Sequence, residues 1–430
     1  MFDKDTIFAK ATASGRSGVV VIRISGDHAL NAFRAFGRAN PCPARQAVLH
    51  KFVHQEDFID SGLIIYFPAP NSFTGEDVVE FQLHGGTAIV KQVTEVLSNL
   101  PHFRLAKAGE FAQRAFLNQK MDLVEVEGLV DIINAETKSQ HEQAARLMQG
   151  HASNFFANLR QRIIEPMALL EAYIDFPDEE IPPEVSGQIN EAIQQLKKDI
   201  HYQITSGQSA ERIRDGFVVV LLGEPNSGKS TLLNALVKRD AAIVSNIAGT
   251  TRDLIEIECE IKSLPVTLID TAGIRESQDE IEQQGVKRAL AKAQQADMTI
   301  QLADSSCSMK RHKEADIVIA TKSDAHPAPD FDYDLLISAH QNKGIDQVLA
   351  VIASHLEDQL PKEDCFALHQ RHRQLLQSAY EALELFDAKG APEIQAEHLR
   401  VAATSLADII GAHTVEDLLD IIFSSFCIGK

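Results

Sequence analysis

Several kinds of hydrophobic pattern follow one another along this 430-residue chain. In residues 1–118 short apolar runs such as Val19–Ile24 alternate with turn residues, which predicts a compact α+β domain. In residues 119–214 apolar side chains recur at three- and four-residue steps, the pattern of core-facing helices. In residues 215–357 continuous apolar runs predict buried parallel strands between helices. Helical periodicity returns in residues 358–430.

Helical segments thus flank the α/β segment on both sides. The simplest arrangement is one helical domain into which an α/β domain is inserted, because the ends of a compact domain often lie close together and tolerate insertion. The chain is long enough for two or three domains that each bury a core. We therefore expect a multidomain protein with an α+β N-terminal domain, an all-α domain and an inserted α/β domain.

Four nucleotide-binding signatures lie in the α/β segment. In order they are Gly223–Ser230 (Gly-Glu-Pro-Asn-Ser-Gly-Lys-Ser), Gly249–Thr251, Asp270–Gly273 and Thr321–Asp324. This order is that of a guanine-nucleotide switch and predicts a Ras-like P-loop GTPase. The alternative for the first motif alone is a chance glycine turn, which the three later motifs exclude.

The first motif has the features of a phosphate-binding loop. Gly223 and Gly228 allow backbone N–H groups to face the phosphates at a helix N-terminus. Lys229 would reach the β- and γ-phosphates, and the Ser230 hydroxyl would ligate Mg²⁺. The expected nucleotide-binding residues here are Asn226, Ser227, Gly228, Lys229, Ser230 and Thr231.

The next two motifs belong to loops that respond to the γ-phosphate in GTPases. Thr251, in preference to Thr250, is expected to contact Mg²⁺ and the γ-phosphate; a solvated turn is the alternative. Asp270 would lie in the outer shell of the metal, and the N–H of Gly273 would contact the γ-phosphate. The expected nucleotide-binding residues are Ser245, Asn246, Ile247, Ala248, Gly249, Thr250, Thr251, Asp270, Thr271, Ala272 and Gly273.

The fourth motif recognises the base. A carboxylate only accepts hydrogen bonds, so Asp324 can bind the N1–H and 2-amino groups of guanine and select GTP over ATP. Thr321 stands where Asn is usual, and its hydroxyl can still tie the motif to the glycine loop. The expected residues on the base side are Thr321, Lys322, Asp324, Ser338 and Ala339, the last through a backbone N–H near guanine O6.

The chain departs from the usual GTPase pattern at two places. Ras-like enzymes place a Gln after the glycine of the third motif to orient the attacking water, but Ile274 stands there, so hydrolysis needs another device. Only residues 305–316 separate the strands expected at Met298–Asp304 and Ile317–Ala320, close to the roughly 10-residue minimum for a crossover. The usual helix between them should be short or absent.

Composition limits where the protein works and what it binds. With 61 acidic and 41 basic residues, the formal charge of −20 repels nucleic-acid phosphates at long range, so any RNA contact must be local or shared with a partner. Lys310–Lys313 and His369–Arg373 are candidate contacts, although solvated helix faces are the preferred interpretation. No apolar run of about 18 residues and no signal peptide are evident, which predicts a soluble cytoplasmic protein. Five scattered cysteines indicate neither disulfides nor a zinc site.

The motifs, together with Arg23–Gly26, Gly109–Leu123 and the terminal Cys427–Lys430, resemble the bacterial tRNA-modification GTPase family MnmE, also called TrmE. The resemblance spans the chain, and the terminal Cys-x-Gly-Lys is its most specific part. It implies a homodimer that, with an MnmG-like FAD protein, adds an aminomethyl-type group to C5 of the tRNA wobble uridine. It implies that the one-carbon unit comes from 5-formyl- or 5,10-methylene-tetrahydrofolate in the N-terminal, dimerising domain. Neither membrane nor DNA is an expected partner.

The resemblance also implies a folate site formed by Arg23, Glu80, Lys120 and Lys430. From the pattern alone, Arg23 is interpreted as an edge-strand charge and Glu80 as a solvent-side strand residue. Cys427 is either a nucleophile whose pKa a C-terminal Lys lowers or a small buried apolar residue.

A potassium ion beside the phosphates is a further implication, and it would replace the missing glutamine. A cation there neutralises charge that develops during phosphoryl transfer. The implied potassium ligands are Asn226, Ser245, Ile247 and Thr250, Glu282 would position the water, and the expected catalytic residues are Glu282, Lys229 and Thr251.

Two rival functions remain open. One is a molecular switch in ribosome assembly without group-transfer chemistry, which would not need the folate-type residues or the terminal Cys-Ile-Gly-Lys. The other is a folate-dependent transferase that GTP merely regulates, which product analysis of tRNA would distinguish.

Overall fold

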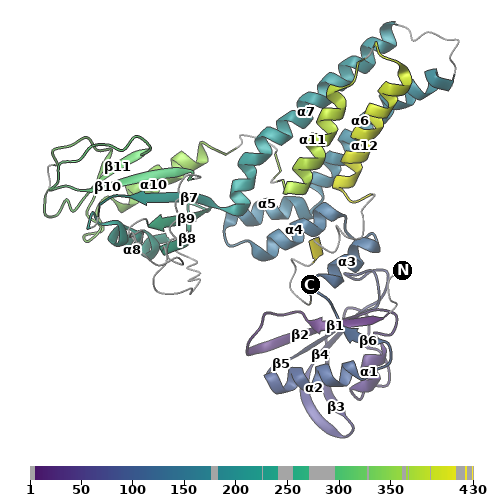
Figure 1. Ribbon diagram of the computed structural model, residues 1–430. Coiled ribbons are helices and arrows are strands. Elements are labelled where there is room, and N and C mark those ends of the chain that lie inside the picture. Colours follow the sequence, from purple (N-terminus) through teal and green to yellow (C-terminus); the bar gives the residue numbers. More distant parts are fainter. Residues whose placement is uncertain are drawn as a thin grey trace, which may run out of the picture. The chain divides into compact units, whose positions relative to one another are not determined.

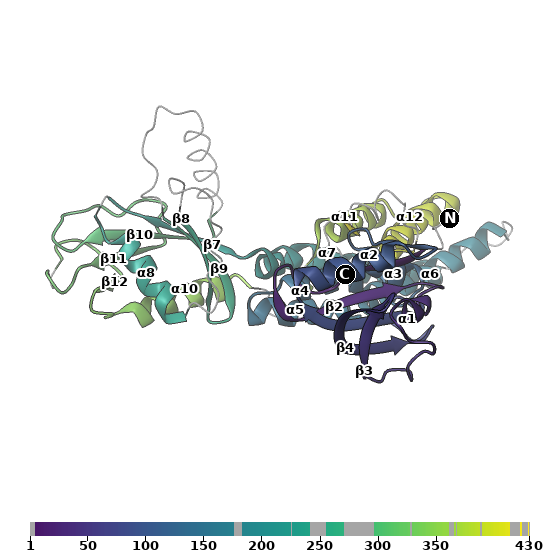
Figure 2. The same cartoon turned by 90° about the horizontal axis from the view of Figure 1, so that it is seen from below.

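The computed structural model describes residues 5–175, 183–224, 226–240, 255–270, 296–326, 329–360, 365–366, 368–387, 389–412, 422–423 and 429. The chain forms two compact units, one made of Met1–Val130 with Ala407–Lys430 and the other of Asp131–Leu406 (Figures 1 and 2). The end of the chain thus groups with the N-terminal unit, whereas the sequence assigned 358–430 to the helical part. The four domain boundaries drawn from the sequence stay predictions.

A six-stranded sheet is the centre of the N-terminal unit, with strand order β3-β4-β5-β2-β1-β6. Helices α1 and α2 pack on one face, where buried phenylalanines such as Phe36, Phe52 and Phe81 form the core. The elements are β1 Thr6–Lys10, β2 Ser17–Ser25, α1 Asn31–Ala35, β3 Val48–His54, β4 Asp57–Phe67, β5 Val78–Gly85, α2 Thr87–Ser98 and β6 Phe103–Leu105.

The C-terminal segment returns to this unit at two points. Phe423 packs with residues of α3 (Glu110–Leu117) and α4 (Leu123–Asn134) in a small core. Gly429, in the left-handed region at φ +101°, lies so close to β1 that an added Cβ would meet the carbonyl oxygen of Lys10 at 2.1 Å. Gly429 therefore lies against the first strand of the same unit.

The helical part of the second unit is built from amphipathic helices whose apolar stripes face one another. Helix α7 packs against α6 and α11 (Figure 1). Among the described helices, none combines the length and the apolarity that crossing a bilayer needs. The helices are α5 Lys138–Met148, α6 His151–Asp175, α7 Pro183–Asp215, α11 Gln370–Glu384 and α12 Pro392–Ile409.

The interpretation of His369–Arg373 as a solvated helix face is wrong. His372 is fully buried, and Arg373 pairs with Glu211 of α7. Arg373 thus joins helix α11 to α7, because a cation near an acidic partner can be partly buried where a lone one cannot. His372 lies next to the ring of Phe156 of α6.

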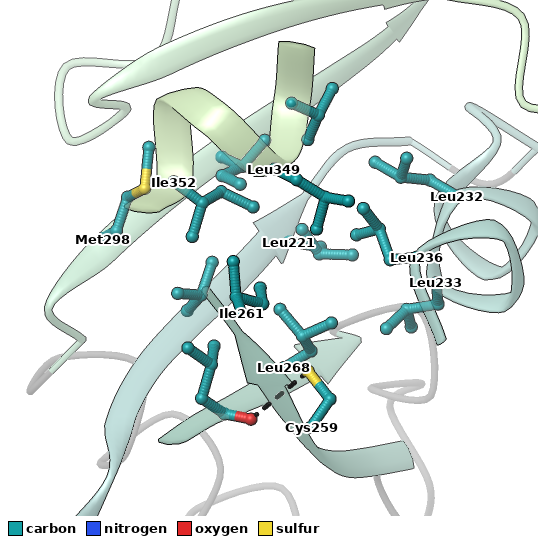
Figure 3. Packing of buried hydrophobic residues seen from close by; sticks show 14 of the residues in the cluster. Leu221, Leu232, Leu233, Leu236, Cys259, Ile261, Leu268, Met298, Leu349 and Ile352 are labelled. Atoms are coloured by element: carbon teal, nitrogen blue, oxygen red, sulfur yellow. Dashed lines mark hydrogen bonds between the residues drawn. The ribbon is translucent and has the colours of Figure 1, made fainter. Parts of the chain in front are cut away.

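A second six-stranded sheet, of order β12-β11-β10-β7-β9-β8, forms the inserted α/β part. All its pairs are parallel except the antiparallel hairpin β8–β9. Leucines of α8 and residues of α10 pack on the strands, with Leu221, Leu268 and Met298 between them (Figure 3). The elements are β7 Phe217–Leu222, α8 Lys229–Asp240, β8 Ile255–Ile261, β9 Leu264–Asp270, β10 Met298–Asp304, β11 Ile317–Thr321, β12 Leu335–Leu336 and α10 Ile345–Glu357.

Residues 305–316 contain no helix, as the sequence predicted. Gln301 of β10 holds this segment: its side-chain amide donates to the carbonyl of Lys310 at 3.2 Å and accepts from the N–H of His312 at 2.7 Å. Lys310–Lys313 is therefore exposed on a loop, and its interpretation as a helix face is wrong.

The two ends of the inserted part lie close together. Arg212, in the last turn of α7, donates to the side-chain oxygen of Gln359 just after α10, at 2.8 Å. This proximity is what an insertion into a helical domain requires.

Candidate functional site

Residues in left-handed conformations shape the glycine loop between β7 and α8. Gly223 has φ +150°, Asn226 φ +69° and Gly228 φ +94°. An added Cβ on Gly223 would lie 2.4 Å from the carbonyl oxygen of Leu302, so no other residue fits. A loop of this kind at the N-terminus of a helix makes a backbone concavity that binds anions.

Lys229 places its ammonium group inside this loop. The Nζ atom donates to the carbonyl oxygens of Gly223 at 2.6 Å and Glu224 at 2.8 Å, and the residue is 3% exposed. Burial lowers the pKa of the Lys229 ammonium, and the charge of Asp270 opposes that effect. The loop thus holds a cation where the phosphates of a nucleotide would bind.

The first and third motifs meet through Ser230 and Asp270. The Oγ of Ser230 donates to Oδ2 of Asp270 at 3.0 Å, and Asp270 is 2% exposed at the end of β9. A hydroxyl and a carboxylate are the hard oxygen ligands that Mg²⁺ prefers. These two residues therefore fit the metal that accompanies a nucleotide triphosphate, while Thr231 lies beside them in the first turn of α8.

The base-reading motif is joined to the glycine loop, as the sequence predicted. The Oγ1 of Thr321 donates to the carbonyl oxygen of Ser227 at 2.7 Å, and both residues are buried. Ser338, also buried, donates to Oδ1 of Asp324 at 2.6 Å, and this hydrogen bond lowers the pKa of the Asp324 carboxyl. Asp324 is thus held as an ionised acceptor next to Ala339.

Asp304 is a residue of this site that the sequence interpretation missed. Its Oδ2 accepts from Nζ of Lys322 at 2.6 Å, which is the main reason that the pKa of Asp304 falls to about 2. Its position at the carboxyl end of β10 was a usable signal, because ligands of parallel sheets bind at that edge. A pocket of ≈190 Å³ adjoins it, lined by Glu224, Asn226, Ser227, Leu302, Ala303, Asp304, Cys307, Ser308 and Met309.

The remaining expected residues of the switch loops and the chain end lie outside the described residues. They are Ser245, Asn246, Ile247, Ala248, Gly249, Thr250, Thr251, Thr271, Ala272, Gly273, Ile274, Glu282, Cys427 and Lys430.

In the N-terminal unit, Arg23 and Glu80 face each other across neighbouring strands. Their side chains form an ion pair at 2.9 Å, and the Arg23 guanidinium lies over the rings of Phe73 and Phe111 at 5.2 and 5.7 Å. The interpretation of Arg23 as an edge-strand charge is wrong, because β2 lies between β5 and β1. Glu80 is not on a freely solvated face either, since its side chain is 16% exposed.

The loop before β5 connects this pair with Lys120. Phe73 of the loop packs on Arg23, and an added Cβ on Gly75 would meet Cε of Lys120 at 3.2 Å. Glu76 of the same loop is anchored by Arg114 at 3.0 Å. Arg23 and Lys120 therefore contact a single, well-anchored loop, and Glu80 is held beside them by its ion pair with Arg23.

Comparisons with known proteins decide the family. Residues 6–120 match the family model described as GTP-binding protein TrmE N-terminus, and residues 123–427 match the MnmE helical domain. A tRNA modification GTPase MnmE of Parvibaculum lavamentivorans is 44% identical over 441 residues, covering 99% of this chain and 100% of the relative. The MnmE of Dinoroseobacter shibae is 43% identical over 432 residues, with 99% and 100% covered. The chain belongs to the MnmE family.

Solved structures of other GTPases resemble part of this MnmE-family chain. Aquifex aeolicus Era bound to GDP and aluminium fluoride is 22% identical, with 41% of this chain and 69% of Era covered and a TM-score of 0.25. The G domain of the T. maritima FeoB iron transporter is 24% identical, with 32% and 98% covered and a TM-score of 0.25. With the glycine loop, the Ser230–Asp270 pair and Asp324 in place, this member of the MnmE family is a GTP hydrolase.

Proposed function

We propose that this MnmE-family GTPase takes part in modifying the wobble uridine of tRNA. With an MnmG-like FAD protein it adds an aminomethyl-type group at C5, using a one-carbon unit carried by tetrahydrofolate. The names of its relatives support the tRNA substrate. The observation that supports the folate-dependent part is the Arg23–Glu80 ion pair, in which Arg23 lies over two aromatic rings and contacts the same loop as Lys120.

Each part of the GTP site has a task in this function. Lys229 neutralises phosphate charge, while Ser230 and Asp270 hold Mg²⁺, which stabilises the charge on the transferring phosphoryl group. Asp324, kept ionised by Ser338, reads guanine. Thr251 completes the metal site, and Glu282 positions water.

Potassium would bind beside the phosphates at Asn226, Ser245, Ile247 and Thr250. Asn226 supports this role because it stands in the glycine loop and carries a carbonyl oxygen, a hard ligand for a monovalent cation. The cation would supply the charge stabilisation that a Ras-like glutamine and its partner arginine provide elsewhere.

The polar pair of the N-terminal unit suits a reduced folate. Glu80 can accept from the N–H groups of the pterin, and Arg23, paired with Glu80 at 2.9 Å, holds that carboxylate in place. Phe73 is partly exposed and offers a flat apolar surface for the ring, whereas the fully buried Phe111 supports the Arg23 guanidinium from inside the unit. Lys120 adds positive charge, and the position of Gly429 against Lys10 supports a role for the following residue, Lys430, in the same unit.

The remaining parts of the proposal follow from the substrate. The protein works in the cytoplasm, where tRNA is modified, and as a homodimer joined through its N-terminal domains. With a net charge of −20, it depends on its flavoprotein partner for much of the attraction to tRNA.

Nucleoside analysis of wobble uridines tests the function. Cells that lack the gene are complemented with the parent, with Lys229→Ala, with Glu80→Ala, or with Glu95→Ala as a matched control whose carboxylate is exposed on α2. The parent and the control should restore the C5 modification, and the other two should not. A normal modification level in cells without the gene, together with a defect in ribosomal subunits, would favour the ribosome-assembly switch instead.

A further inference from the structure

The β8–β9 hairpin of the GTPase is bound by a residue of the helical part. Its turn residues Lys262 and Ser263 have φ +46° and +73°, the geometry of a tight two-residue hairpin loop. The carbonyl oxygen of Ser263 accepts from both the Oγ and the N–H of Ser139, at 2.6 and 3.3 Å. One acceptor in the GTPase is thus held by two donors of one helical residue.

Ser139 is well placed to hold the turn because it lies in the first turn of α5. The first N–H groups of a helix have no partner within the helix, and the positive end of the helix dipole favours a carbonyl oxygen. Thr137 and Gln140 fix this helix start through a reciprocal capping box. Gln140 also donates to the carbonyl of Arg214 at 3.0 Å, close to where α7 leads into β7.

The same hairpin carries Asp270 at its other end. Strand β9 runs from Leu264, next to the turn, to Asp270, which accepts the hydrogen bond of Ser230. Between these ends β9 is paired with β7 on one side and β8 on the other, so it moves as a stiff element. A displacement of the β8–β9 turn would therefore also displace Asp270 at the expected metal site.

The contact between the two parts is local. A pocket of ≈140 Å³ lies beside it, lined by Thr137 and Gln140 from the helical side and by Cys259 and Val266 from the hairpin. Strand pairing holds the hairpin in the sheet without the serine, so removing the hydroxyl should leave the GTPase folded.

We propose that Ser139 is a positioning residue for GTP hydrolysis: from outside the GTPase it fixes the β8–β9 turn and, through β9, the place of Asp270. This inference rests on the GTPase activity and not on the proposed tRNA or folate chemistry. It implies that the helical part influences the rate of GTP hydrolysis. Loss of the Ser139 hydroxyl would weaken its contact with Ser263 and lower that rate.

The test compares steady-state GTP hydrolysis by the full chain and its variants. Ser139→Ala should lower kcat by about 2- to 10-fold, the equivalent of one hydrogen bond, while KM for GTP stays within about twofold. Ser139→Thr, which keeps a hydroxyl, should restore kcat. Ser263→Gly suits the left-handed turn and keeps the acceptor carbonyl, so it should behave as the parent, as should Ser378→Ala on the exposed side of α11.

Hydrogen exchange provides a second measurement. The amides of Leu264 and of residues 266–270 should exchange faster in Ser139→Ala than in the parent, and Ser139→Thr should match the parent. An unchanged kcat in Ser139→Ala, or equal loss in the Ala and Thr variants, would overturn the proposal. Faster exchange spread over the whole GTPase would also overturn it, because the effect would then be general loosening.

Discussion

The hydroxyl of Thr321 donates to the carbonyl oxygen of Ser227 at 2.7 Å, which joins the base-reading motif to the phosphate loop. A second acceptor, the carbonyl oxygen of Ala303, lies at 3.1 Å. Because Thr321 is 3% exposed, no water can replace the hydroxyl without rearrangement. The contact therefore fixes the distance between the two halves of the nucleotide site.

Replacing Thr321 by valine keeps its shape but removes this donor. We expect GTP and GDP to bind roughly 5- to 30-fold more weakly, the cost of about 1–2 kcal/mol for leaving a buried acceptor unpaired. Thr321→Ser should bind like the parent, since it keeps the hydroxyl. Titration with a fluorescent nucleotide measures both, and parental affinity in the valine variant would contradict the role of the contact.

Asp324→Asn should change the base preference from guanine toward xanthine. An amide N–H can donate to the 2-oxo group of xanthine, whereas the 2-amino group of guanine needs an acceptor. The buried Ser338 hydroxyl can bond the amide oxygen, so the side chain should stay in place. Competition between GTP and xanthosine triphosphate measures the shift. Equal affinity of the variant and the parent for GTP would refute the assigned base contact.

The GTPase could be predicted from sequence because its chemistry lies in short contiguous motifs. The glycine loop, the Thr321 contact and the missing helix at 305–316 follow from local residue types and segment length. The Ser338–Asp324 and Lys322–Asp304 contacts could not be predicted in this way. Each joins a residue of the fourth motif to a residue that is distant in sequence and is brought near only by the fold.

The N-terminal unit shows why contacts between distant residues could not be predicted from the sequence. Whether Arg23 lies on an edge or an inner strand depends on strand order, which apolar alternation does not encode. Its pairing with Glu80 and stacking on Phe111 arise from strand register and from a helix far along the chain. The Ser139–Ser263 contact was equally hidden, because a serine in the first turn of one helix and a serine in a distant hairpin turn carry no distinguishing pattern.

Potassium should accelerate GTP hydrolysis relative to sodium at equal ionic strength, and Asn226→Ala should remove the difference. Because Asn226 has φ +69°, alanine adds backbone strain there, so Asn226→Gly is the cleaner variant: it fits the conformation and lacks the amide. Both variants should lose the dependence on the cation. Identical parental turnover in the two salts would reject the potassium site.

Glu282→Ala should separate binding from chemistry. If Glu282 positions the attacking water, hydrolysis should slow by roughly 10²-fold or more, the scale of a lost general base or water-orienting group. Nucleotide affinity should stay near the parental value, since we assign the phosphate and base contacts to Lys229 and Asp324. Single-turnover hydrolysis at saturating GTP is the measurement, and unaltered turnover would remove Glu282 from the mechanism.

Glu80→Ala should weaken binding of 5-formyltetrahydrofolate while leaving GTP affinity unchanged. Loss of a charge-assisted acceptor costs about 1.5–3 kcal/mol, or roughly 10- to 100-fold in affinity. Removing Glu80 also takes away the partner that orients Arg23 at 2.9 Å, so Glu80→Gln, which keeps an oxygen in place, should lose less. Glu95→Ala removes an equal charge from the exposed face of α2 and should bind folate like the parent. Calorimetry measures folate binding, and no binding by the parent, or full binding by Glu80→Ala, would reject the folate-dependent part of the proposed function. Neither outcome would affect the assignment of the GTPase, because Lys229, Ser230 and Asp324 belong to the other compact unit.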